Sequence, residues 1–375
     1  MRIAIEALGI HSYGGGRTAT MNLLQALFDL DRQNEYLLFL SQPEATLLAP
    51  NVRQIIAPSR KRFFMRLWAQ MALPALTFGY DVVHFVKNLG VFGLRVPFIV
   101  TVYDITTILY PELFPKIDVW YWYFLQKHTL RQAKKVIAIS QKTAQDIRIF
   151  YGISSEHSTV VYPSCGRHFQ PTSAEETSRV RKFYALPEHY VLHVGRIDPK
   201  KNIPMLIEAF AQFRKRTDFP GKLVLVGEQY KKKPDLAIHD RIAGLRLQQV
   251  VQLLGAVPDR DLPAIYTGAT MAAFPSMHEG FGLVALEALA CGTPLVVNRA
   301  GAITEVVGDA ALVMAQSTPE CLAESLTHIW RSPELRQQLR EAGRARSQLF
   351  SWEATARQTL AVYEEIGSRR ENSTT

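Results

Sequence analysis

The stretch YVLHVGRIDPKKN, residues 190–202, is an apolar run followed by a short polar loop. Its first five residues, 190–194, are typical of a buried β-strand, and the chain then passes through Gly195 into a loop that carries Arg196 and Lys201. In a parallel sheet this loop would lie at the carboxyl edge, where open α/β sheets bind their ligands. Two cations at such an edge suit a diphosphate; the alternative is a pair of solvated surface cations.

The alternation of short β-rich runs and helical patterns continues along the whole chain. It predicts an α/β fold with two parallel sheets, each covered by helices on both faces, and therefore two Rossmann-like domains. The predicted strands span residues 2–7, 36–40, 81–85, 98–102, 136–139 and 158–161 in the first half, and 190–194, 222–226, 250–254, 271–274 and 294–298 in the second. Two prolines and a glycine in residues 162–171 predict a linker, and we place the domains at residues 1–168 and 169–349.

The composition is that of an ordinary globular protein. The chain has 375 residues, 47% hydrophobic and 21% charged, which allows two or three domains and excludes collagen-like, coiled-coil and disordered classes. Lys and Arg total 43 against 34 Asp and Glu. The net charge of +9 favours an anionic partner, such as nucleic acid, an acidic lipid surface or a phosphorylated small molecule.

The three cysteines, Cys165, Cys291 and Cys321, form no CxxC pair and have no nearby His that would suggest a zinc site. This usage indicates a reducing compartment. The first residues lack the features of a signal peptide, and no apolar stretch of about 18 residues could span a bilayer. We therefore expect a cytoplasmic protein, which could still rest peripherally on the inner face of a membrane.

Gly14, Gly15 and Gly16 follow the first predicted strand and precede a helical pattern over residues 18–27. Glycines let backbone N–H groups approach a phosphate closely, and the start of a helix favours negative charge. The alternative is an ordinary turn between a strand and a helix. The spacing matches neither GxGxxG nor GxxxxGK[ST], which disfavours a dinucleotide site and a P-loop.

The stretch HEGFGLVALEALACGTP, residues 278–294, is the most specific in the chain. Glu279 lies in a glycine-rich loop, and Glu287 lies eight positions later in the helix that this loop opens. Loop amides and the helix start can hold anionic oxygen, while carboxylates accept hydrogen bonds from sugar hydroxyls. A buried Glu in an apolar helix is costly without such partners, so Glu287 is a candidate binding residue.

These motifs together resemble a known family. Residues 195–202, the E-x7-E pattern from Glu279 to Glu287 and the ACGTP of residues 290–294 look like the retaining, nucleotide-sugar-dependent glycosyltransferases of family four. In the first half, TVYD at residues 101–104, YPELFP at 110–115 and VIAIS at 136–140 also match, so the resemblance covers nearly the whole chain.

The resemblance implies the GT-B architecture, in which two Rossmann-like domains with parallel sheets face each other across a cleft. The C-terminal domain would hold the donor and the N-terminal domain the acceptor, and a last helix over residues 350–367 would cross back to the N-terminal domain. By position, Arg196 and Lys201 would bind the donor diphosphate, Glu279 the transferred sugar and Glu287 the ribose hydroxyls.

The remaining implied contacts come largely from the backbone. Gly15 and Gly16 would close on the donor from the N-terminal side, and the segment 254–257, ending at Val257, would lie against the base. Backbone amides for the sugar or phosphate would come from Gly280, Phe281, Gly282 and Leu283.

The sequence departs from the family pattern after the predicted strand 98–102. Many members have His-Asp there, with a His thought to contact the sugar and assist transfer, whereas this chain has Tyr103-Asp104. Tyr can donate a hydrogen bond, but its ordinary pKa near 10 makes it a poor proton carrier at neutral pH. A noncatalytic nucleotide-sugar-binding protein and a nucleotide-sugar epimerase on a similar fold are therefore the alternatives. A Gly-Gly of the family is also changed, to Gly301-Ala302.

Three other features have simpler interpretations. Asp259-Arg260-Asp261 spells a DxD string that binds manganese in another glycosyltransferase fold, but its position before a helical pattern indicates a helix cap. The lysine run at residues 231–233 lacks interleaved aromatics, so it indicates a solvated loop and not a nucleic-acid site. His84 and His193 lie in apolar strands and are interpreted as core histidines.

Two aromatic stretches lie in the N-terminal half. Residues 60–68, RKRFFMRLW, place cations beside Phe and Trp on one predicted helix, which suits an anionic membrane interface; the alternative is a packed helix with solvated cations. The second stretch, residues 119–125, reads VWYWYFL and is predicted to be core.

The function expected from the resemblance is transfer of a hexose from a nucleoside diphosphate sugar to a hydroxyl of a glycan or a lipid-linked saccharide, with retention of configuration. GDP-mannose is our preferred donor. No cofactor and no metal are expected, because Arg196, Lys201 and helix amides occupy the place where paired carboxylates would hold a metal.

Overall fold

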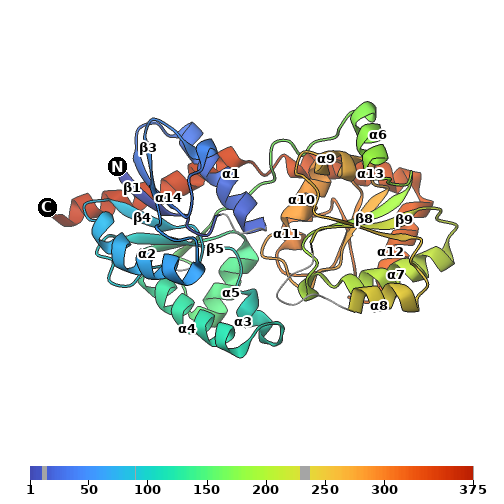
Figure 1. The fold of residues 1–375 in the computed structure, drawn as a ribbon, viewed down its shortest axis with the longest axis horizontal. Helices are drawn as coiled ribbons and strands as arrows, with labels where there is room; N and C mark the ends of the chain where they lie inside the picture. Colours follow the sequence, from blue (N-terminus) through green and yellow to red (C-terminus); the bar gives the residue numbers. More distant parts are fainter. Residues whose placement is uncertain (11–14, 89, 229–236, 375) are drawn as a thin grey trace. The chain divides into compact units, whose positions relative to one another are not determined.

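The computed structural model describes residues 1–10, 15–88, 90–228 and 237–374 (Figure 1). Gly14 and the lysines at 231–233, which the sequence analysis discussed, lie outside these ranges. The chain divides into two compact units, one of Met1–Ser164 with Ser351–Thr375 and one of Cys165–Phe350.

Unit 1 is a parallel sheet of seven strands in the order β3-β2-β1-β4-β5-β6-β7, covered by helices. The strands are β1 (Arg2–Glu6), β2 (Glu35–Leu40), β3 (Val52–Ile56), β4 (Val82–Phe85), β5 (Phe98–Val102), β6 (Lys135–Ala138) and β7 (Ser158–Val160). The helices are α1 (Gly15–Leu30), α2 (Arg62–Leu76), α3 (Thr106–Leu109), α4 (Lys116–Gln132), α5 (Gln141–Tyr151) and α14 (Trp352–Thr374), with 3-10 turns η1 (Ala45–Leu47) and η2 (Pro111–Leu113).

Strands β4 and β5, near the centre of this sheet, are apolar except for His84 and Thr101 because helices cover both faces of the sheet. Every residue of β4 and β5 is buried, as expected for strands inside a parallel sheet. Strand β3 was not predicted; it is an edge strand that includes Arg53 and Gln54 and pairs with β2 on one side. An edge strand with a solvated side lacks the continuous apolar run on which the other predictions rest.

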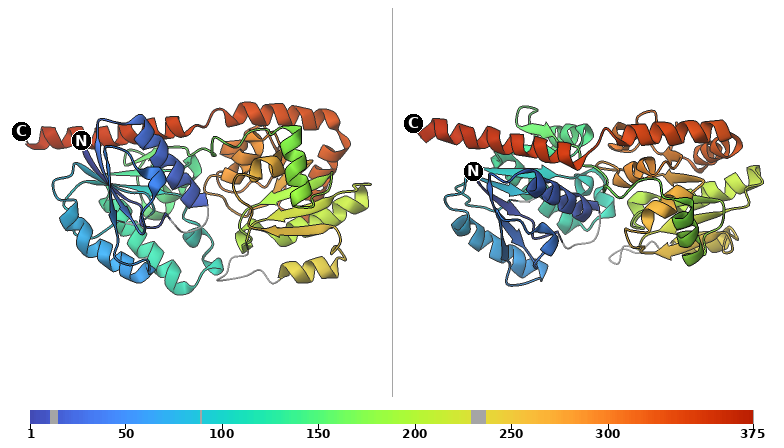
Figure 2. Two further views of the ribbon diagram at one scale, coloured as in Figure 1. Left: turned by 45° about the horizontal axis from the view of Figure 1, so that its top comes forward. Right: turned by 90° about the horizontal axis from the view of Figure 1, so that it is seen from above.

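Helix α14 completes unit 1 from the far end of the sequence. It lies along α1 (Figure 2), and its Tyr363 hydroxyl is 2.6 Å from Nδ1 of His84 on β4. The other ring nitrogen of His84 is 2.8 Å from Thr101 Oγ1, and burial lowers the pKa of this His to about 3. The interpretation of His84 as a core histidine is confirmed.

One packing prediction for unit 1 is wrong. The aromatic stretch of residues 119–125 is not core: the side chains of Trp120 and Phe124 are 63% and 52% exposed. Helix α4 instead buries Gln126, Thr129 and Leu130 from its last turns. Aromatic composition alone does not say which face of a helix is covered.

Unit 2 is a parallel sheet of six strands in the order β10-β9-β8-β11-β12-β13. The strands are β8 (Tyr190–Val194), β9 (Lys222–Val226), β10 (Val251–Gly255), β11 (Met271–Phe274), β12 (Leu295–Val297) and β13 (Leu312–Val313). The helices are α6 (Ala174–Phe183), α7 (Ile203–Arg216), α8 (Ala237–Gly244), α9 (Leu262–Gly268), α10 (Leu283–Ala290), α11 (Ile303–Val307), α12 (Pro319–Arg331) and α13 (Pro333–Ser347), with the 3-10 turn η3 (Pro199–Lys201).

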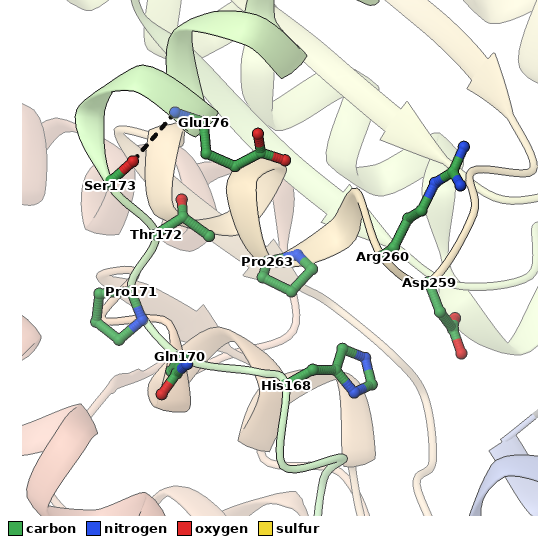
Figure 3. Close-up of a pocket in the computed structure, with 9 residues that line it drawn as sticks. All are labelled: His168, Gln170, Pro171, Thr172, Ser173, Glu176, Asp259, Arg260 and Pro263. Carbon is green, nitrogen blue, oxygen red and sulfur yellow. Dashed lines mark hydrogen bonds between the residues drawn. The ribbon is translucent and has the colours of Figure 1, made fainter.

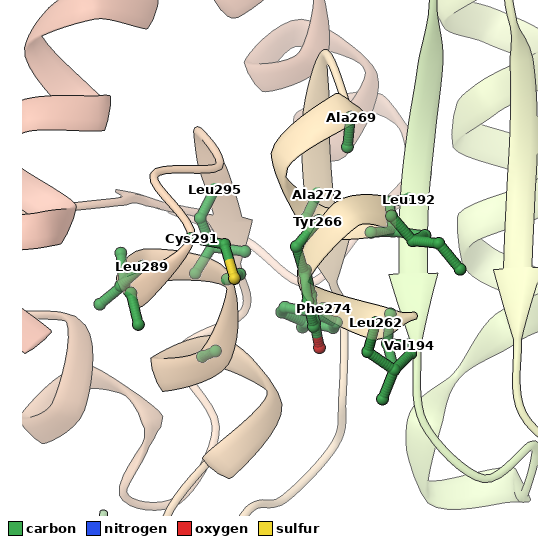
Figure 4. Packing of buried hydrophobic residues seen from close by; sticks show 14 of the residues in the cluster. Leu192, Val194, Leu262, Tyr266, Ala269, Ala272, Phe274, Leu289, Cys291 and Leu295 are labelled. Atoms are coloured by element: carbon green, nitrogen blue, oxygen red, sulfur yellow. The ribbon is translucent and has the colours of Figure 1, made fainter. Parts of the chain in front are cut away.

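Two apolar clusters cover the two faces of this sheet. One joins Tyr266, Phe274 and Leu289 with the buried Cys291 (Figure 4), and the other joins alternate strand residues such as Val191 with α7 and α12. The alternation of faces along each strand accounts for the division, because neighbouring side chains of a strand point in opposite directions. Together the clusters hold the loops at the strand ends in place.

The strand orders locate the site in each unit. In open parallel sheets, ligands bind outside the carboxyl ends of the strands, at the point where the strand order reverses. In unit 1 the order reverses between β1 and β4, and in unit 2 it reverses between β8 and β11.

Candidate active site

Lys201 and Glu279 form a buried ion pair at the reversal point of the unit 2 sheet. Lys201 ends η3, which follows β8, and Glu279 lies in the loop that follows β11. Nζ of Lys201 is 2.6 Å from Oε1 of Glu279, and both residues are almost fully buried. Because β8 and β11 are hydrogen-bonded neighbours, two residues 78 positions apart in the sequence meet at one edge.

Ser276 supports the Glu279 carboxylate and is itself held by Asn298. Ser276 Oγ donates to the same Oε1 over 2.6 Å, and the Ser276 carbonyl accepts from Asn298 Nδ2 over 3.0 Å. Burial alone would raise the pKa of Glu279, but the ammonium of Lys201, with Lys200 and Ser276, lowers that pKa to about 2. Glu279 is therefore anionic at neutral pH and able to accept a hydrogen bond from a sugar hydroxyl.

Gly301 holds the backbone of Glu279 in position. Its φ is +63°, and a Cβ added there would lie 2.1 Å from the Glu279 carbonyl oxygen. The N–H of Ala302 donates to that same oxygen over 2.8 Å. Only glycine fits at 301, whereas Ala302 has a φ of −89°, which any residue adopts. The change from Gly-Gly to Gly301-Ala302 therefore leaves the backbone of the site undisturbed.

Glu287 is buried inside α10 and has one hydrogen-bond donor next to it. The hydroxyl of Tyr266, on α9, is 2.9 Å from Glu287 Oε2. Burial, with a smaller contribution from Asp259, raises the pKa of Glu287 to about 8 against the opposing effects of Tyr266 and Lys201. Burial of a carboxyl group costs free energy, and hydrogen bonds from the hydroxyls of a bound polyol would offset that cost, so Glu287 suits a binding role.

In the loop between Glu279 and the start of α10, the backbone packs closely against its neighbours. Gly282 has a φ of +105°, and a Cβ there would lie 3.1 Å from the side chain of Ile303. Leu283 begins α10, and Phe281 is buried with its ring 5.6 Å from that of Phe350. Gly280 is half-buried. The predicted amide donors thus lie at the start of a helix, anchored by Phe281.

Arg196 and Val257 lie at the same carboxyl edge as the ion pair. Arg196 follows β8, its side chain is 44% exposed, and its Nε is 3.3 Å from Asp198 Oδ2. Val257 follows β10 and packs, partly buried, against the apolar cluster of Figure 4. The contact of Arg196 with the diphosphate and that of Val257 with the base stay predictions.

In unit 1 a chain of hydrogen bonds links the glycine-rich segment to Tyr103. The Thr20 hydroxyl donates to the Gly16 carbonyl over 2.7 Å, so the Tyr103 hydroxyl, 2.9 Å away, donates to Thr20. The Tyr103 N–H donates to Oδ1 of Asn88 over 3.2 Å. Burial raises the pKa of Tyr103 to about 12, so this residue keeps its proton at neutral pH.

Gly15, Gly16, Tyr103 and Asp104 all follow strands of unit 1 at their carboxyl ends. Gly15 and Gly16 begin α1 after β1, while Tyr103 and Asp104 follow β5. Oδ1 of Asp104 accepts from the N–H of Thr106, the first residue of α3, over 3.1 Å.

Asp261, the last residue of the DxD string at residues 259–261, occupies the N-cap position of α9, in agreement with the helix cap expected from the sequence. The Asp261 side chain makes no capping hydrogen bond to α9; it accepts instead from Arg179 Nη2 over 3.1 Å and from the Tyr184 hydroxyl over 2.8 Å. Asp259 and Arg260 face an open cavity of about 550 Å³ (Figure 3). The lining of this cavity includes neither Lys201 nor Glu279, so the cavity is distinct from the site at the sheet edge.

The sequence analysis missed the residues that orient the two glutamates. Ser276 lies three positions before Glu279, close enough to have been suspected, but Tyr266 and Asn298 carry no local signal. Within the described residues, no cluster of three or more His, Cys, Asp or Glu is placed to hold a metal ion.

Comparison with known proteins places this chain in a family. The family model "Glycosyl transferases group 1" matches residues 175–346, and "Glycosyltransferase Family 4" matches residues 13–165. The chain is 30% identical to the MMP alpha-(1->4)-mannosyltransferase of Mycolicibacterium hassiacum over 83% of its own length and 76% of that protein. It is 29% identical to O-antigen chain mannosyltransferase B of Escherichia coli over 71% of its length and 69% of that protein.

Solved structures share the fold. Sucrose-phosphate synthase from Thermosynechococcus elongatus aligns with a TM-score of 0.80 and 24% identity over 98% of this chain and 99% of that one. Anabaena HepE, solved in complex with UDP and glucose, aligns with a TM-score of 0.77 and 22% identity over 97% and 99%. The two parallel-sheet units, the matched models and the mannosyltransferase relatives lead to one conclusion: the chain belongs to family 4 of the group 1 glycosyltransferases and has the GT-B fold.

Proposed function

We propose that this protein transfers a mannosyl group from GDP-mannose to a hydroxyl of a glycan or a lipid-linked saccharide, with retention of configuration, on the cytoplasmic side of a membrane. The buried Lys201–Glu279 pair supports this proposal most directly, because it sets a cation and an anion side by side at the reversal point of the sheet. The mannosyltransferase names of two relatives support the choice of sugar.

The donor would be held by charge and by carboxylate acceptors. Lys201 has three N–H donors, of which one reaches Glu279, so the ammonium can also donate to phosphate oxygens. Arg196 and the start of α10 add positive potential on the same edge. Glu279 would accept from the sugar hydroxyls and Glu287 from the ribose hydroxyls.

In the proposed reaction the bond from the anomeric carbon to the phosphate oxygen breaks while the acceptor oxygen bonds to the same face of that carbon. The acceptor proton passes to the leaving phosphate oxygen. Lys201 and Arg196 stabilise the negative charge that develops on the diphosphate, where fixed charges contribute most to catalysis. Tyr103, which keeps its proton, would orient groups as a hydrogen-bond donor and carry no proton itself.

A panel of GDP-, UDP-, ADP- and dTDP-sugars tests the proposal. Thermal stability is measured with each sugar, followed by product analysis with a saccharide acceptor. A ligand at 100 times its Kd should stabilise the protein by about 2.7 kcal/mol. GDP-mannose is expected to give the largest shift and an α-linked product. Binding without turnover on any acceptor would favour a noncatalytic binding protein, and isomerisation of the donor without an acceptor would favour an epimerase.

Activity is expected to survive excess EDTA. The charge of the leaving diphosphate is neutralised in this proposal by Lys201 and Arg196, a task that Mg²⁺ performs in sites built from carboxylates. The measurement is turnover of GDP-mannose before and after chelation and after addition of Mn²⁺. Loss of turnover with EDTA and its return with Mn²⁺ would show that the diphosphate assignment is wrong.

Donor affinity is expected to rise with pH up to about 8. Ribose hydroxyls donate to an ionised carboxylate, and burial holds the pKa of Glu287 near 8, so a proton must leave when the donor binds. Donor Kd should therefore fall by up to about tenfold per pH unit below 8 and level off above it. Calorimetry across this pH range measures the dependence, and Glu287→Gln is the control, because it should lose this pH dependence. If donor Kd changed equally with pH in the parent and in Glu287→Gln, the assignment of Glu287 to the ribose hydroxyls would be wrong.

A further inference from the structure

The outer surfaces of α2 and α4 in unit 1 carry large apolar side chains that face solvent. On α2, Phe63 and Met71 are 73% and 72% exposed, and Leu67 lies between them at the same spacing of four residues. On α4, Ile117 is 71% exposed, and Trp120 and Phe124, which follow at helical spacing, are exposed as well. Residues three or four positions apart share one side of a helix, so each helix presents an apolar stripe.

Side-chain contacts join the two stripes into one surface. The Arg66 guanidinium of α2 lies 5.7 Å from the centre of the Tyr121 ring of α4 and donates to its hydroxyl. Gln70 Nε2 donates to the carbonyl of Phe92 over 3.0 Å, and the Phe92 ring is 5.2 Å from that of His128 on α4. We call this surface the α2–α4 face; both helices are labelled in Figure 1. Its exposed apolar residues are Phe63, Phe64, Leu67, Met71, Phe92, Ile117, Trp120 and Phe124.

The charge around this face is positive. Residues 60–78 contain four cations and no carboxylate, and residues 111–132 contain Lys116, Lys127 and Arg131 against Glu112 and Asp118. The sequence predicted that Arg60 and Lys61 lie on the same helix as Phe63 and Trp68, but α2 begins only at Arg62. Both cations precede its first turn and are exposed. Exposed aromatic and aliphatic side chains with flanking cations match the boundary between anionic headgroups and acyl chains.

The face is also hollowed on the α4 side. A groove of about 520 Å³ runs between η2 and α4; its lining is mostly apolar, including Phe114, Val119 and Tyr123, and its two charged residues are Lys116 and Glu112. The groove is open to solvent along apolar walls, a shape suited to acyl chain atoms with a cation near their headgroup. Exposed apolar side chains gathered on one face mark an interaction surface, whereas a single exposed apolar side chain does not.

We propose that the α2–α4 face docks this protein onto an anionic lipid bilayer. Helices α2 and α4 lie in the plane of the interface, the apolar stripes enter the acyl boundary, and the cations contact lipid phosphates. No helix among the described residues is long and apolar enough to cross a membrane. Docking would bring unit 1 to a lipid-linked acceptor. This role for the surface rests on the proposed function.

Vesicle binding by the purified full chain tests the docking without any donor or acceptor. The parent should sediment with vesicles of equal parts phosphatidylglycerol and phosphatidylcholine, and bind vesicles of phosphatidylcholine alone weakly. Phe63→Ser, Met71→Ser and Trp120→Ser should each weaken binding about tenfold, equivalent to about 1.4 kcal/mol. The matched control is Phe183→Ser on α6 of unit 2, where the parent side chain is 74% exposed, and it should leave binding unchanged.

A charge arm separates lipid phosphates from general stickiness. Arg60→Ser with Lys61→Ser should weaken binding about 30-fold at low salt, at about 1 kcal/mol per cation, and high salt should remove the difference. Lys182→Ser with Lys215→Ser, both exposed in unit 2, is the matched control and should bind like the parent.

Three outcomes would overturn the proposal. One is equal cosedimentation of the apolar variants and the parent. Another is a parent that binds phosphatidylcholine as tightly as the anionic mixture. The third is a dimer in solution that Phe63→Ser or Trp120→Ser dissociates, which would assign the face to a second copy of the chain. Failure of the proposed function is distinct: it would appear as absent transfer to a soluble acceptor, with vesicle binding intact.

Discussion

Lys201→Met is expected to lower the free energy of unfolding of unit 2 by about 3–5 kcal/mol at neutral pH, because it leaves the buried Glu279 carboxylate without its cation. Two charges removed from water are tolerated only while they compensate each other. Urea titration followed by circular dichroism measures the loss. The double variant Lys201→Met with Glu279→Gln should recover most of it, since Gln carries no charge and can still accept from Ser276.

The pH dependence of this loss has a definite sign. The ion pair holds the pKa of Glu279 at about 2 in the folded protein, below its ordinary value of 4.5. The stability that the pair contributes is therefore present above pH 4.5 and disappears as pH falls toward 2. The difference between parent and Lys201→Met should shrink over the same window.

A surface pair provides the control. Arg216 and Glu324 lie 3.6 Å apart with exposed side chains, so Arg216→Met should cost at most about 1 kcal/mol. A loss in Lys201→Met no larger than this value would show that the Lys201–Glu279 pair is not the charge-compensated centre that the proposed function requires.

Glu279→Gln is expected to lower kcat by about 10- to 150-fold with little change in donor Kd, the equivalent of one charged hydrogen bond of about 1.5–3 kcal/mol. As the phosphate leaves, positive charge develops at the anomeric carbon, and an anion beside the sugar stabilises that charge more than it stabilises the bound donor. Steady-state kinetics with GDP-mannose, together with calorimetric donor Kd, separates the two effects. Because Glu279→Gln leaves the buried Lys201 ammonium without its anion, urea titration is used first to confirm that the variant is folded under the assay conditions.

Glu287→Gln is the matched comparison, since it makes the same change eight residues away. Ribose hydroxyls do not alter during transfer, so their contact with Glu287 is equal in ground and transition states, and its loss should raise donor KM at constant kcat. Reversed phenotypes, or full activity in both variants, would overturn the two role assignments. Unfolding of Glu287→Gln would assign that residue to the core, with Tyr266 as its partner.

Local sequence was sufficient for most of the fold. Strands such as β5 and β8 are short, mostly apolar and β-rich runs, and this pattern predicted both the strands and the parallel sheet that they form. The edge strand β3 was missed because one side of it is solvated and its pattern is mixed. The prediction of aromatic core at residues 119–125 failed because a helix buries only one of its sides, and composition does not say which.

The sequence by itself determined which residues could do the chemistry: the cations after β8, the two glutamates around α10 and the glycines whose backbone angles other residues rarely adopt. Only the tertiary structure decided which of them meet. Lys201 reaches Glu279 because β8 and β11 are neighbours in the sheet, and Tyr266 reaches Glu287 because α9 packs against α10. Such pairings depend on strand order and helix packing, which are set by the burial of the whole core and leave no mark on the few residues around each partner.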